Sequence, residues 1–196
     1  MKPRLALLII DMMNDFQFEE GDELASSSVT IAKKIATLKK AAKEQAIPVI
    51  YVNDNYGRWQ SDFNEVIQHC KNASSSAEQI IQWLQPETSD YFVLKPQFSG
   101  FFYTPLDLLL RELDVRSLLI TGIAGNMCVQ FTASDAYMRG FALNIPEDTT
   151  ASSTVDQHER SIDMFKDVLG ADTTASDQLN FIHLLKRADE HYAKTN

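Results

Sequence analysis

The stretch "LLITGIAGNMCVQFTASDAYMRG", residues 118–140, changes from an aliphatic run to a helical pattern within a few residues. This change predicts a buried strand over residues 117–121 that passes through a turn into a helix over residues 126–139. Gly140 follows as the expected end of that helix. Cys128, one of only two cysteines in the chain, lies at the junction, which raises the question of why a thiol stands where a strand ends and a helix begins.

The same alternation of short apolar runs and longer helical patterns continues through the whole chain. Further strands are expected over residues 5–10, 48–53, 91–94 and 141–145, with a short extended piece near 171–173. Helices are expected over residues 28–45, 64–71, 76–84, 106–113 and 156–169, and from residue 176 onward. Alternating strands and helices predict an α/β fold, with a parallel sheet covered by helices on both faces.

Composition excludes several classes of partner. A net charge of −9 argues against a nucleic acid or an anionic membrane as partner, because both attract basic proteins.

The apolar run at residues 5–10 is too short to cross a bilayer or to form the core of a signal peptide. Two cysteines make no disulfide framework, which favours reduced thiols and a cytoplasmic location. The length of 196 residues fits one domain.

Three residues with reactive side chains are expected at the carboxyl ends of strands. Asp11 follows residues 5–10, Lys95 follows residues 91–94, and Cys128 comes just past the strand of the opening stretch. Ligands of parallel α/β proteins bind beyond these strand ends. The three residues therefore predict a site for a small-molecule substrate.

The chemistry of these residues suits nucleophilic catalysis. Free N–H groups and the dipole at a helix start would lower the pKa of the Cys128 thiol and could hold an oxyanion. A partly desolvated Asp11 carboxylate would accept the thiol proton, and the Lys95 ammonium would stabilise both anions. Each residue alone also fits an ordinary role, as a buried cysteine, a turn cap or a solvated lysine.

Four motifs carry a resemblance to a known family. They are "LLIIDMMNDF" (7–16), "LKPQFSGFFYTPLDLLL" (94–110), "LLITGIAGNMCVQFTASDAYMRGF" (118–141) and "EDTTASS" (147–153). In this order and spacing they resemble the isochorismatase-like cysteine hydrolase superfamily. That group includes nicotinamidases, N-carbamoylsarcosine amidohydrolase, and amidases that cleave ureides and biuret.

The resemblance implies a single hydrolase domain over residues 1–196, with a three-layer α/β/α Rossmann-like fold and a six-stranded sheet of order 3-2-1-4-5-6. It implies a catalytic triad of Asp11, Lys95 and Cys128. It also implies a cis peptide between Ile123 and Ala124, which aims the backbone N–H groups of Ala124 and Cys128 at an oxyanion. The expected reaction is C–N bond cleavage in a small amide, ureide or carbamoyl compound through a thioester. A homodimer or homotetramer is expected as well.

The segment "VNDNYGRWQSDF", residues 52–63, departs from one branch of this superfamily. Nicotinamidases of the group hold a metal with an Asp and two His soon after the second strand. This segment offers Asp54 and no histidine, and His69, fifteen positions further on, is expected on a helix surface. We therefore predict no metal and no cofactor, and regard nicotinamide as an unfavoured substrate.

Substrate recognition is expected from aromatic and polar residues near the triad. The predicted pocket residues are Asn14, Phe16, Tyr56, Trp59, Phe98 and Phe101. Aromatic walls suit a flat or apolar acyl group, although these side chains equally suit loop packing, a subunit contact or, for Phe16, the core. Arg58 is a candidate partner for a substrate carboxylate or an ordinary exposed arginine.

Two other functions remain open at this level. The first is isochorismatase-type cleavage of a vinyl ether, in which a carboxylate acts as the acid and the thiol has no role. The second is a non-catalytic binding protein or redox sensor on the same scaffold. Replacement of Cys128 by alanine separates them from an amidase, because only the amidase loses its turnover.

Overall fold

The structure, a computed structural model, describes residues 3–57 and 62–195. Its strands are β1 (Leu5–Ile10), β2 (Val49–Asp54), β3 (Tyr91–Lys95), β4 (Ser117–Ile123), β5 (Ala142–Asn144) and β6 (Thr150–Ala151). Its helices are α1 (Gly21–Glu44), α2 (Phe63–Lys71), α3 (Ser75–Leu84), α4 (Leu106–Glu112), α5 (Gln130–Met138), α6 (Val155–Asp167) and α7 (Phe181–Thr195). A π-helical turn, Gly125–Val129, stands between β4 and α5.

The strands form one parallel sheet in the order β3-β2-β1-β4-β5, which confirms the predicted fold class. The last strand differs from the expectation. The piece near residues 171–173 contributes a bridge between Asn144 and Asp172, whereas β6 pairs with β4. The physical reason is that β5 ends opposite Leu119, so the last residues of β4 remain available to β6.

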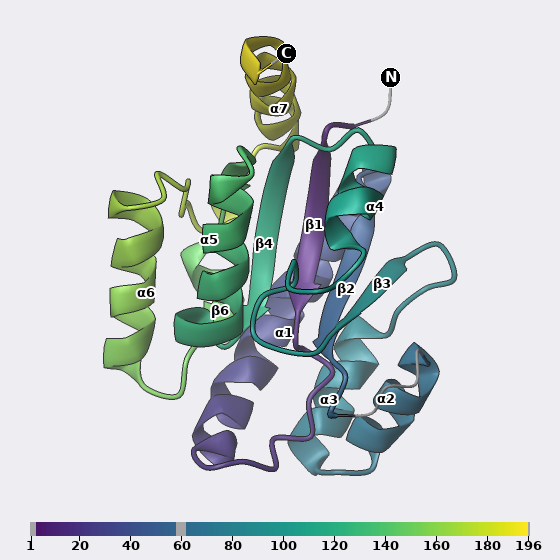
Figure 1. Cartoon of the computed structure of the whole chain (residues 1–196). Coiled ribbons are helices and arrows are strands. Elements are labelled where there is room, and N and C mark those ends of the chain that lie inside the picture. The colour runs from purple at the N-terminus through teal and green to yellow at the C-terminus, as the bar shows by residue number, and fades with distance from the viewer. Residues whose placement is uncertain (1–2, 58–61, 196) are drawn as a thin grey trace.

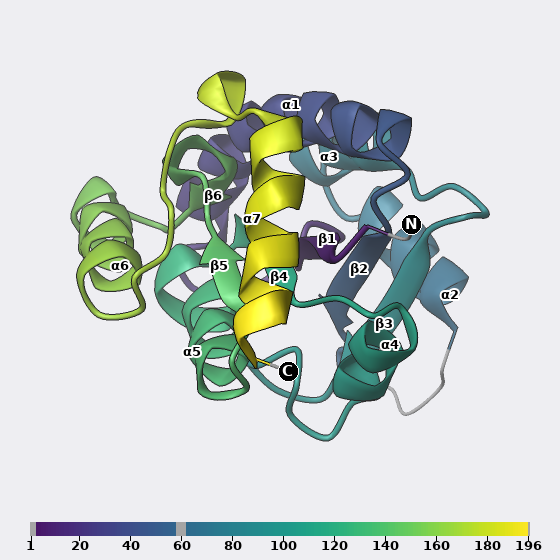
Figure 2. The same cartoon turned by 90° about the horizontal axis from the view of Figure 1, so that it is seen from above.

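Helices cover both faces of the sheet (Figures 1 and 2). Figure 2 shows α1 and α3 on one side of the sheet and α4 and α5 on the other. Side chains of α1, α2, α3 and α7 share one core with the sheet, and side chains of α4, α5 and α6 share the second. The two cores correspond to the two helical layers of a three-layer fold.

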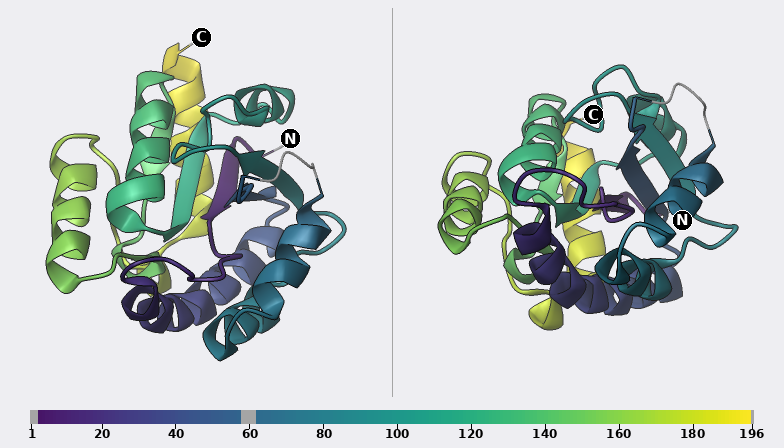
Figure 3. Two further views of the ribbon diagram at one scale, coloured as in Figure 1. Left: turned by 60° about the horizontal axis from the view of Figure 1, so that its bottom comes forward. Right: turned by 90° about the horizontal axis from the view of Figure 1, so that it is seen from below.

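β1 decides where the site lies, because it runs between β2 and β4 in the middle of the sheet. All six of its residues are fully buried. Leu5, Leu7 and Ile9 face one core, and Ala6, Leu8 and Ile10 face the other, which explains the uninterrupted apolar run. The chain leaves β1 at Asp11, and Figure 3 shows the loop to α1 crossing this carboxyl edge of the sheet.

α1 begins at Gly21, seven residues before the predicted start at residue 28. Leu24 and Ala25 extend the buried face of the helix, and Asp22 and Glu23 complement the positive end of its dipole. Glycine is required at position 21, because a Cβ there would lie 2.0 Å from the backbone oxygen of Phe16. The acidic pair followed by Leu24 was the sequence signal for the earlier start.

None of the described helices combines the length and the apolar character that a bilayer crossing requires. α1 has 24 residues, but it carries five lysines.

Candidate active site

Asp11 lies immediately beyond β1 and is held in an unusual backbone conformation. Its φ is +51°, in the left-handed region, and the residue is only 5% exposed. The backbone N–H of Asp54, at the end of β2, donates to Asp11 Oδ1 at 2.8 Å. These constraints turn the carboxylate away from bulk water and toward the neighbouring strand ends, as the sequence predicted.

Lys95 ends β3 and reaches beyond the end of β2 to meet Asp11. Its Nζ lies 2.8 Å from Asp11 Oδ2 and 3.8 Å from Asp54 Oδ2, and its side chain is 1% exposed. Burial lowers the pKa of Lys95, but the negative charges of Asp11, Cys128 and Asp54 and the hydrogen bond to Asp11 together outweigh burial and raise that pKa above its ordinary value. Lys95 is therefore a fixed cation inside the protein.

Cys128 completes the group from the π-helical turn after β4. Lys95 Nζ donates to Cys128 Sγ at 3.5 Å. The turn is wider than an α-helix, since Val129 N–H donates to the carbonyl of Ala124 five residues earlier. The structure thus brings together Asp11, Lys95 and Cys128, which stand far apart in the sequence.

The electrostatics of Cys128 contradict one expectation. A helix start was expected to lower the thiol pKa, but the pKa of Cys128 is raised above its ordinary value. Burial is the largest cause, and the Asp11 carboxylate adds to it by repelling the thiolate and accepting the thiol proton. The charge of Lys95 opposes this shift without overcoming it. The resting group is a thiol.

The backbone before Cys128 has the geometry that the resemblance implied. The peptide bond between Ile123 and Ala124 is cis. Ser152 Oγ, next to β6, accepts a hydrogen bond from Asn126 N–H at 3.2 Å and so fixes the turn. Both Ala124 and Cys128 line the cavity described next.

A cavity of about 530 Å³ opens beside Cys128 at the carboxyl edge of the sheet. Of the predicted pocket residues, Asn14, Tyr56 and Phe98 line it together with Asp11. Three hydrogen bonds hold Tyr56: its N–H donates to Asp54 Oδ1 at 2.6 Å, its hydroxyl donates to the carbonyl of Met13 at 3.0 Å, and the hydroxyl oxygen accepts from Cys70 Sγ at 3.6 Å. The cavity is large enough for a small amide.

Phe16 and Phe101 were expected as pocket walls, and the structure corrects both assignments. Phe16 is 7% exposed and belongs to the core beneath α1. Phe101 is 6% exposed, with Phe141 6.1 Å and the Arg139 guanidinium 4.7 Å from its ring centre. Both rings gain more from burial than from a place at the surface of a loop. Trp59 and Arg58 lie outside the described residues.

Several residues of the cavity were missed in the sequence. The additional lining side chains include Phe18, Glu19 and Glu20 before α1, Asp54, Met127 and Ser153. The position of Met127 beside Cys128 and the "EDTTASS" motif were available signals for two of them. Nothing in the local pattern of residues 18–20 indicated that they return to the strand ends.

His69 was expected on a surface, but it contacts the wall of the cavity. Its Nε2 lies 2.8 Å from Asp15 Oδ2, and its ring packs edge-on against Tyr56 at 5.4 Å. No cluster of three metal-binding side chains occurs among the described residues, and residues 58–61 are Arg, Trp, Gln and Ser. The donor set therefore does not fit an Asp and two His metal site.

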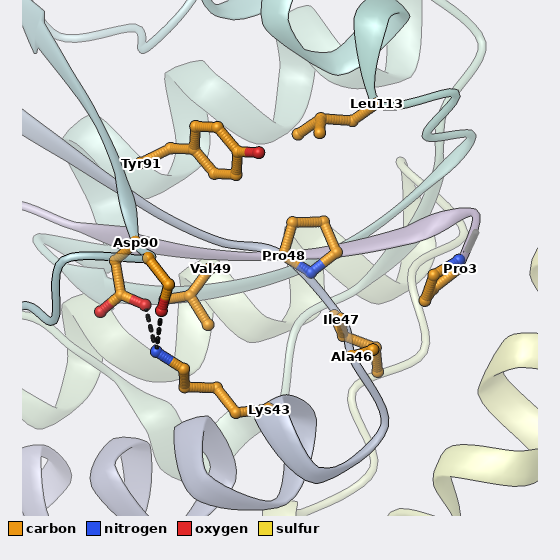
Figure 4. Close-up of a pocket in the computed structure, with 10 residues that line it drawn as sticks. Pro3, Lys43, Ala46, Ile47, Pro48, Val49, Asp90, Tyr91 and Leu113 are labelled. Carbon is orange, nitrogen blue, oxygen red and sulfur yellow. Dashed lines mark hydrogen bonds and ion pairs between the residues drawn. The ribbon is translucent and has the colours of Figure 1, made fainter.

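A separate cavity of about 340 Å³ lies at the opposite edge of the sheet (Figure 4). It is formed where β2 and β3 begin, with Pro48, Tyr91 and Leu113 on its walls. Its ammonium group, Lys43 Nζ, is paired with Asp90 Oδ1 at 2.6 Å. No cysteine is among the described residues that line this cavity, whereas Asp11, Lys95 and Cys128 meet at the other edge.

Comparison with known proteins identifies the family of the chain. An isochorismatase domain model matches residues 5–178. The chain belongs to the isochorismatase family. It is 45% identical over 174 residues to the "Uncharacterized isochorismatase family protein YaaI" of Bacillus subtilis (strain 168), with 89% of this chain and 95% of that protein covered.

Relatives with a named activity are amidohydrolases. The chain is 30% identical over 173 residues to the ureidoacrylate amidohydrolase RutB of Cronobacter sakazakii, covering 74% of this chain and 73% of that protein. The crystal structure of N-carbamoylsarcosine amidase from Thermoplasma acidophilum superimposes with a TM-score of 0.69 at 26% identity, covering 90% and 98% of the two chains. The protein is a hydrolase of this family.

Proposed function

We propose that the protein is a cysteine-dependent hydrolase that cleaves a C–N bond in a small amide, ureide or carbamoyl compound through a thioester intermediate. One observation carries the proposal: Cys128 Sγ and Asp11 Oδ2 both contact the buried Nζ of Lys95, at 3.5 and 2.8 Å, at the edge of an open cavity. The amidohydrolase names of two relatives support the choice of bond.

The raised pKa of Cys128 determines how the reaction begins. Because the resting sulfur is protonated, the thiol proton must leave as the sulfur attacks the carbonyl carbon. Asp11 is the acceptor in reach, and its carboxylate is paired with Lys95. The attack breaks the S–H bond, forms the C–S bond and leaves a tetrahedral oxyanion.

The second half of acylation uses the same residues. The backbone N–H groups of Ala124 and Cys128 stabilise the oxyanion, since both residues line the cavity beside the sulfur. Protonated Asp11 then gives its proton to the departing nitrogen, and collapse of the intermediate yields the thioester and a free amine or ammonia. Asp11, again ionised, takes a proton from water, which attacks the thioester, releases the acid and restores the thiol.

Lys95 has a constant charge in this cycle. Its raised pKa keeps the ammonium protonated while the proton moves between sulfur and carboxylate. The side chain therefore holds both groups in place and offsets whichever of them is negative. Lys95 makes no proton transfer of its own.

A panel of small amides, ureides and carbamoyl compounds, with release of ammonia as the readout, tests the proposal. Wild type should release ammonia, and Cys128→Ala and Cys128→Ser should reduce turnover by at least about 1,000-fold because no thioester forms. Cys70→Ala is the matched control, because Cys70 is a buried cysteine in α2 outside the triad. Trapping of an acylated Cys128 by mass spectrometry should identify the intermediate.

Turnover that survives in Cys128→Ala would refute the proposal, and survival with a vinyl ether as substrate would favour ether cleavage. The homodimer or homotetramer, the single domain and the cytoplasmic location stay predictions.

A further inference from the structure

The cavity beside Cys128 has an unbalanced set of charges. Its lining includes five carboxylates, and no lysine, arginine or histidine is among the described residues that form it. The carboxylates are Asp11, Asp15, Glu19, Glu20 and Asp54. Asp11 is paired with Lys95 and Asp15 with His69, whereas Glu19 and Glu20 are exposed residues of the cavity wall.

The described cation nearest to the reacting sulfur cannot serve an anionic ligand. The side chain of Lys95 is 1% exposed, and its Nζ already contacts Asp11 and Cys128. The N-terminal end of α1 borders the cavity, because Glu20 and Leu24 line it. Asp22 and Glu23 in the first turn of α1 oppose the positive charge of the helix dipole at this end. A carboxylate on the ligand would therefore meet like charges and no partner.

Apolar side chains also line the cavity. Phe98, Phe18 and Met127 line it and are about half exposed, at 46%, 48% and 37%. Phe98 stacks on Phe131 at 5.4 Å, which fixes its ring as one wall. A short hydrocarbon chain would contact these side chains, and the same cavity wall carries Glu19 and Glu20.

We infer that the cavity selects its ligands by charge: it takes amides or ureides whose remote end is uncharged or cationic, and rejects those that carry a carboxylate there. Glu19 and Glu20 are the specificity-determining residues. This inference deepens the proposed function, and so rests on it for the identity of the reacting bond. The named substrate of the relative RutB is, by contrast, an acrylate.

The first test measures charge selection without any substrate. Cys128 is modified by the cationic reagent 2-(trimethylammonium)ethyl methanethiosulfonate or the anionic 2-sulfonatoethyl methanethiosulfonate. In each case the sulfur displaces methanesulfinate and forms a mixed disulfide, which intact mass and peptide mapping locate. Rates are divided by those of 2-mercaptoethanol with the same reagent. The normalised ratio of cationic to anionic rates should be about tenfold, and should shrink as salt is added.

Two double variants test whether Glu19 and Glu20 cause the normalised ratio of cationic to anionic rates. Glu19→Gln with Glu20→Gln should lower it about threefold for each charge removed. The control pair, Glu44→Gln with Glu112→Gln, removes the same charge from the last turns of α1 and α4, and should leave the ratio unchanged. A structural role alone would move the rates of both reagents together.

The second test uses three amides of similar length: 5-aminopentanamide, hexanamide and 4-carbamoylbutanoate. The kcat/KM for ammonia release should be lowest for the anionic amide, and the Glu19→Gln, Glu20→Gln pair should reduce that difference. Ammonia release that persists in Cys128→Ala refutes the proposed function. The charge selection is still tested in that case, because the rates of the two methanethiosulfonate reagents are measured without any substrate.

A normalised rate that is equal for the two reagents, or faster for the anionic one, overturns the inference. A preference for anions that disappears in Arg58→Gln also overturns it, and assigns charge recognition to Arg58.

Discussion

Replacement of Asp11 by asparagine should make Cys128 more reactive toward a simple alkylating agent while it abolishes turnover. The substitution removes the negative charge but keeps an oxygen that can accept from the Asp54 N–H. Lys95 then acts on the sulfur without opposition from a carboxylate, and the pKa of Cys128 falls from its raised position. At neutral pH more thiolate is present, yet the acceptor and donor of the catalytic proton is gone.

The size of the effect follows from the contacts. Because Asp11 Oδ2 and Cys128 Sγ both touch Lys95 Nζ, at 2.8 and 3.5 Å, they lie within about 6.3 Å of each other. At an effective dielectric constant of about 20, two charges at that distance repel by about 2.6 kcal/mol, equivalent to about two pKa units. The thiolate fraction then rises about 100-fold, and the lower nucleophilicity of a more acidic thiol reduces the gain to about tenfold.

The assay is the rate of iodoacetamide modification of Cys128, measured by intact mass from pH 6 to 10, alongside ammonia release from an amide substrate. Asp11→Asn should be alkylated about tenfold faster at pH 7. It should lose at least about 100-fold in kcat/KM because general acid–base catalysis is lost. Asp163→Asn, at an exposed position of α6, is the matched control for charge.

An Asp11→Asn enzyme that is alkylated no faster than wild type would show that Asp11 does not hold the thiol in its protonated form. An enzyme that keeps its turnover would show that another group moves the proton. Either result refutes the reasoning, provided that the circular dichroism spectrum shows the variant to be folded.

Four further variants test the rest of the structure. Gly122→Ala should cost at least about 3 kcal/mol in urea unfolding, because φ is +113° there and a Cβ would lie 2.0 Å from the backbone oxygen of Ile10. Asp90→Asn should cost about 2–3 kcal/mol at pH 7 by the same measurement. Burial raises the pKa of Asp90, but the Glu87 N–H and two lysines lower it overall, so this stability is present above the ordinary carboxyl pKa and the gap to wild type should close as pH falls below about 4. Phe98→Ala should raise KM for an apolar amide and leave stability nearly unchanged, whereas Phe101→Ala should cost about 3–5 kcal/mol of stability and leave KM alone.

The positions of the three reactive residues could be predicted because parallel strands impose one rule on all of them. A residue that follows a buried strand must emerge at the carboxyl edge, and Asp11 and Lys95 are fixed there by their own strands. The position of Cys128 could be predicted from the strand-to-helix transition within residues 118–140 alone. For these three residues the local sequence was sufficient to predict at which edge of the sheet the side chain emerges.

The pocket walls could not be predicted in the same way. Phe98 and Phe101 stand three residues apart in one loop, yet one ring lines the cavity and the other lies in the core. What separates them is tertiary: Thr132 Oγ1 accepts from Gly100 N–H, and Asp135 Oδ2 accepts from the Ser99 hydroxyl, whose oxygen in turn accepts from Phe101 N–H, so that α5 holds this loop with Phe101 turned inward. Such contacts come from a helix more than 30 residues away and leave no trace in local spacing.

The expectation of a lowered pKa for Cys128 was also wrong because of tertiary contacts. The raised pKa changes how the mechanism is understood. The helix start was treated as acting on an isolated thiol, whereas the structure surrounds the sulfur with a carboxylate and an ammonium. An ionised Asp11, a protonated Lys95 and a neutral thiol sum to zero charge in a buried place, and ionising the sulfur as well would leave one negative charge uncompensated. Transfer of the proton from Cys128 to Asp11 during attack avoids that state, because the group stays neutral while the new negative charge develops on the substrate oxygen. The free N–H groups of the turn then matter for that oxygen and not for the sulfur, so a helix start here stabilises the intermediate without making a resting thiolate.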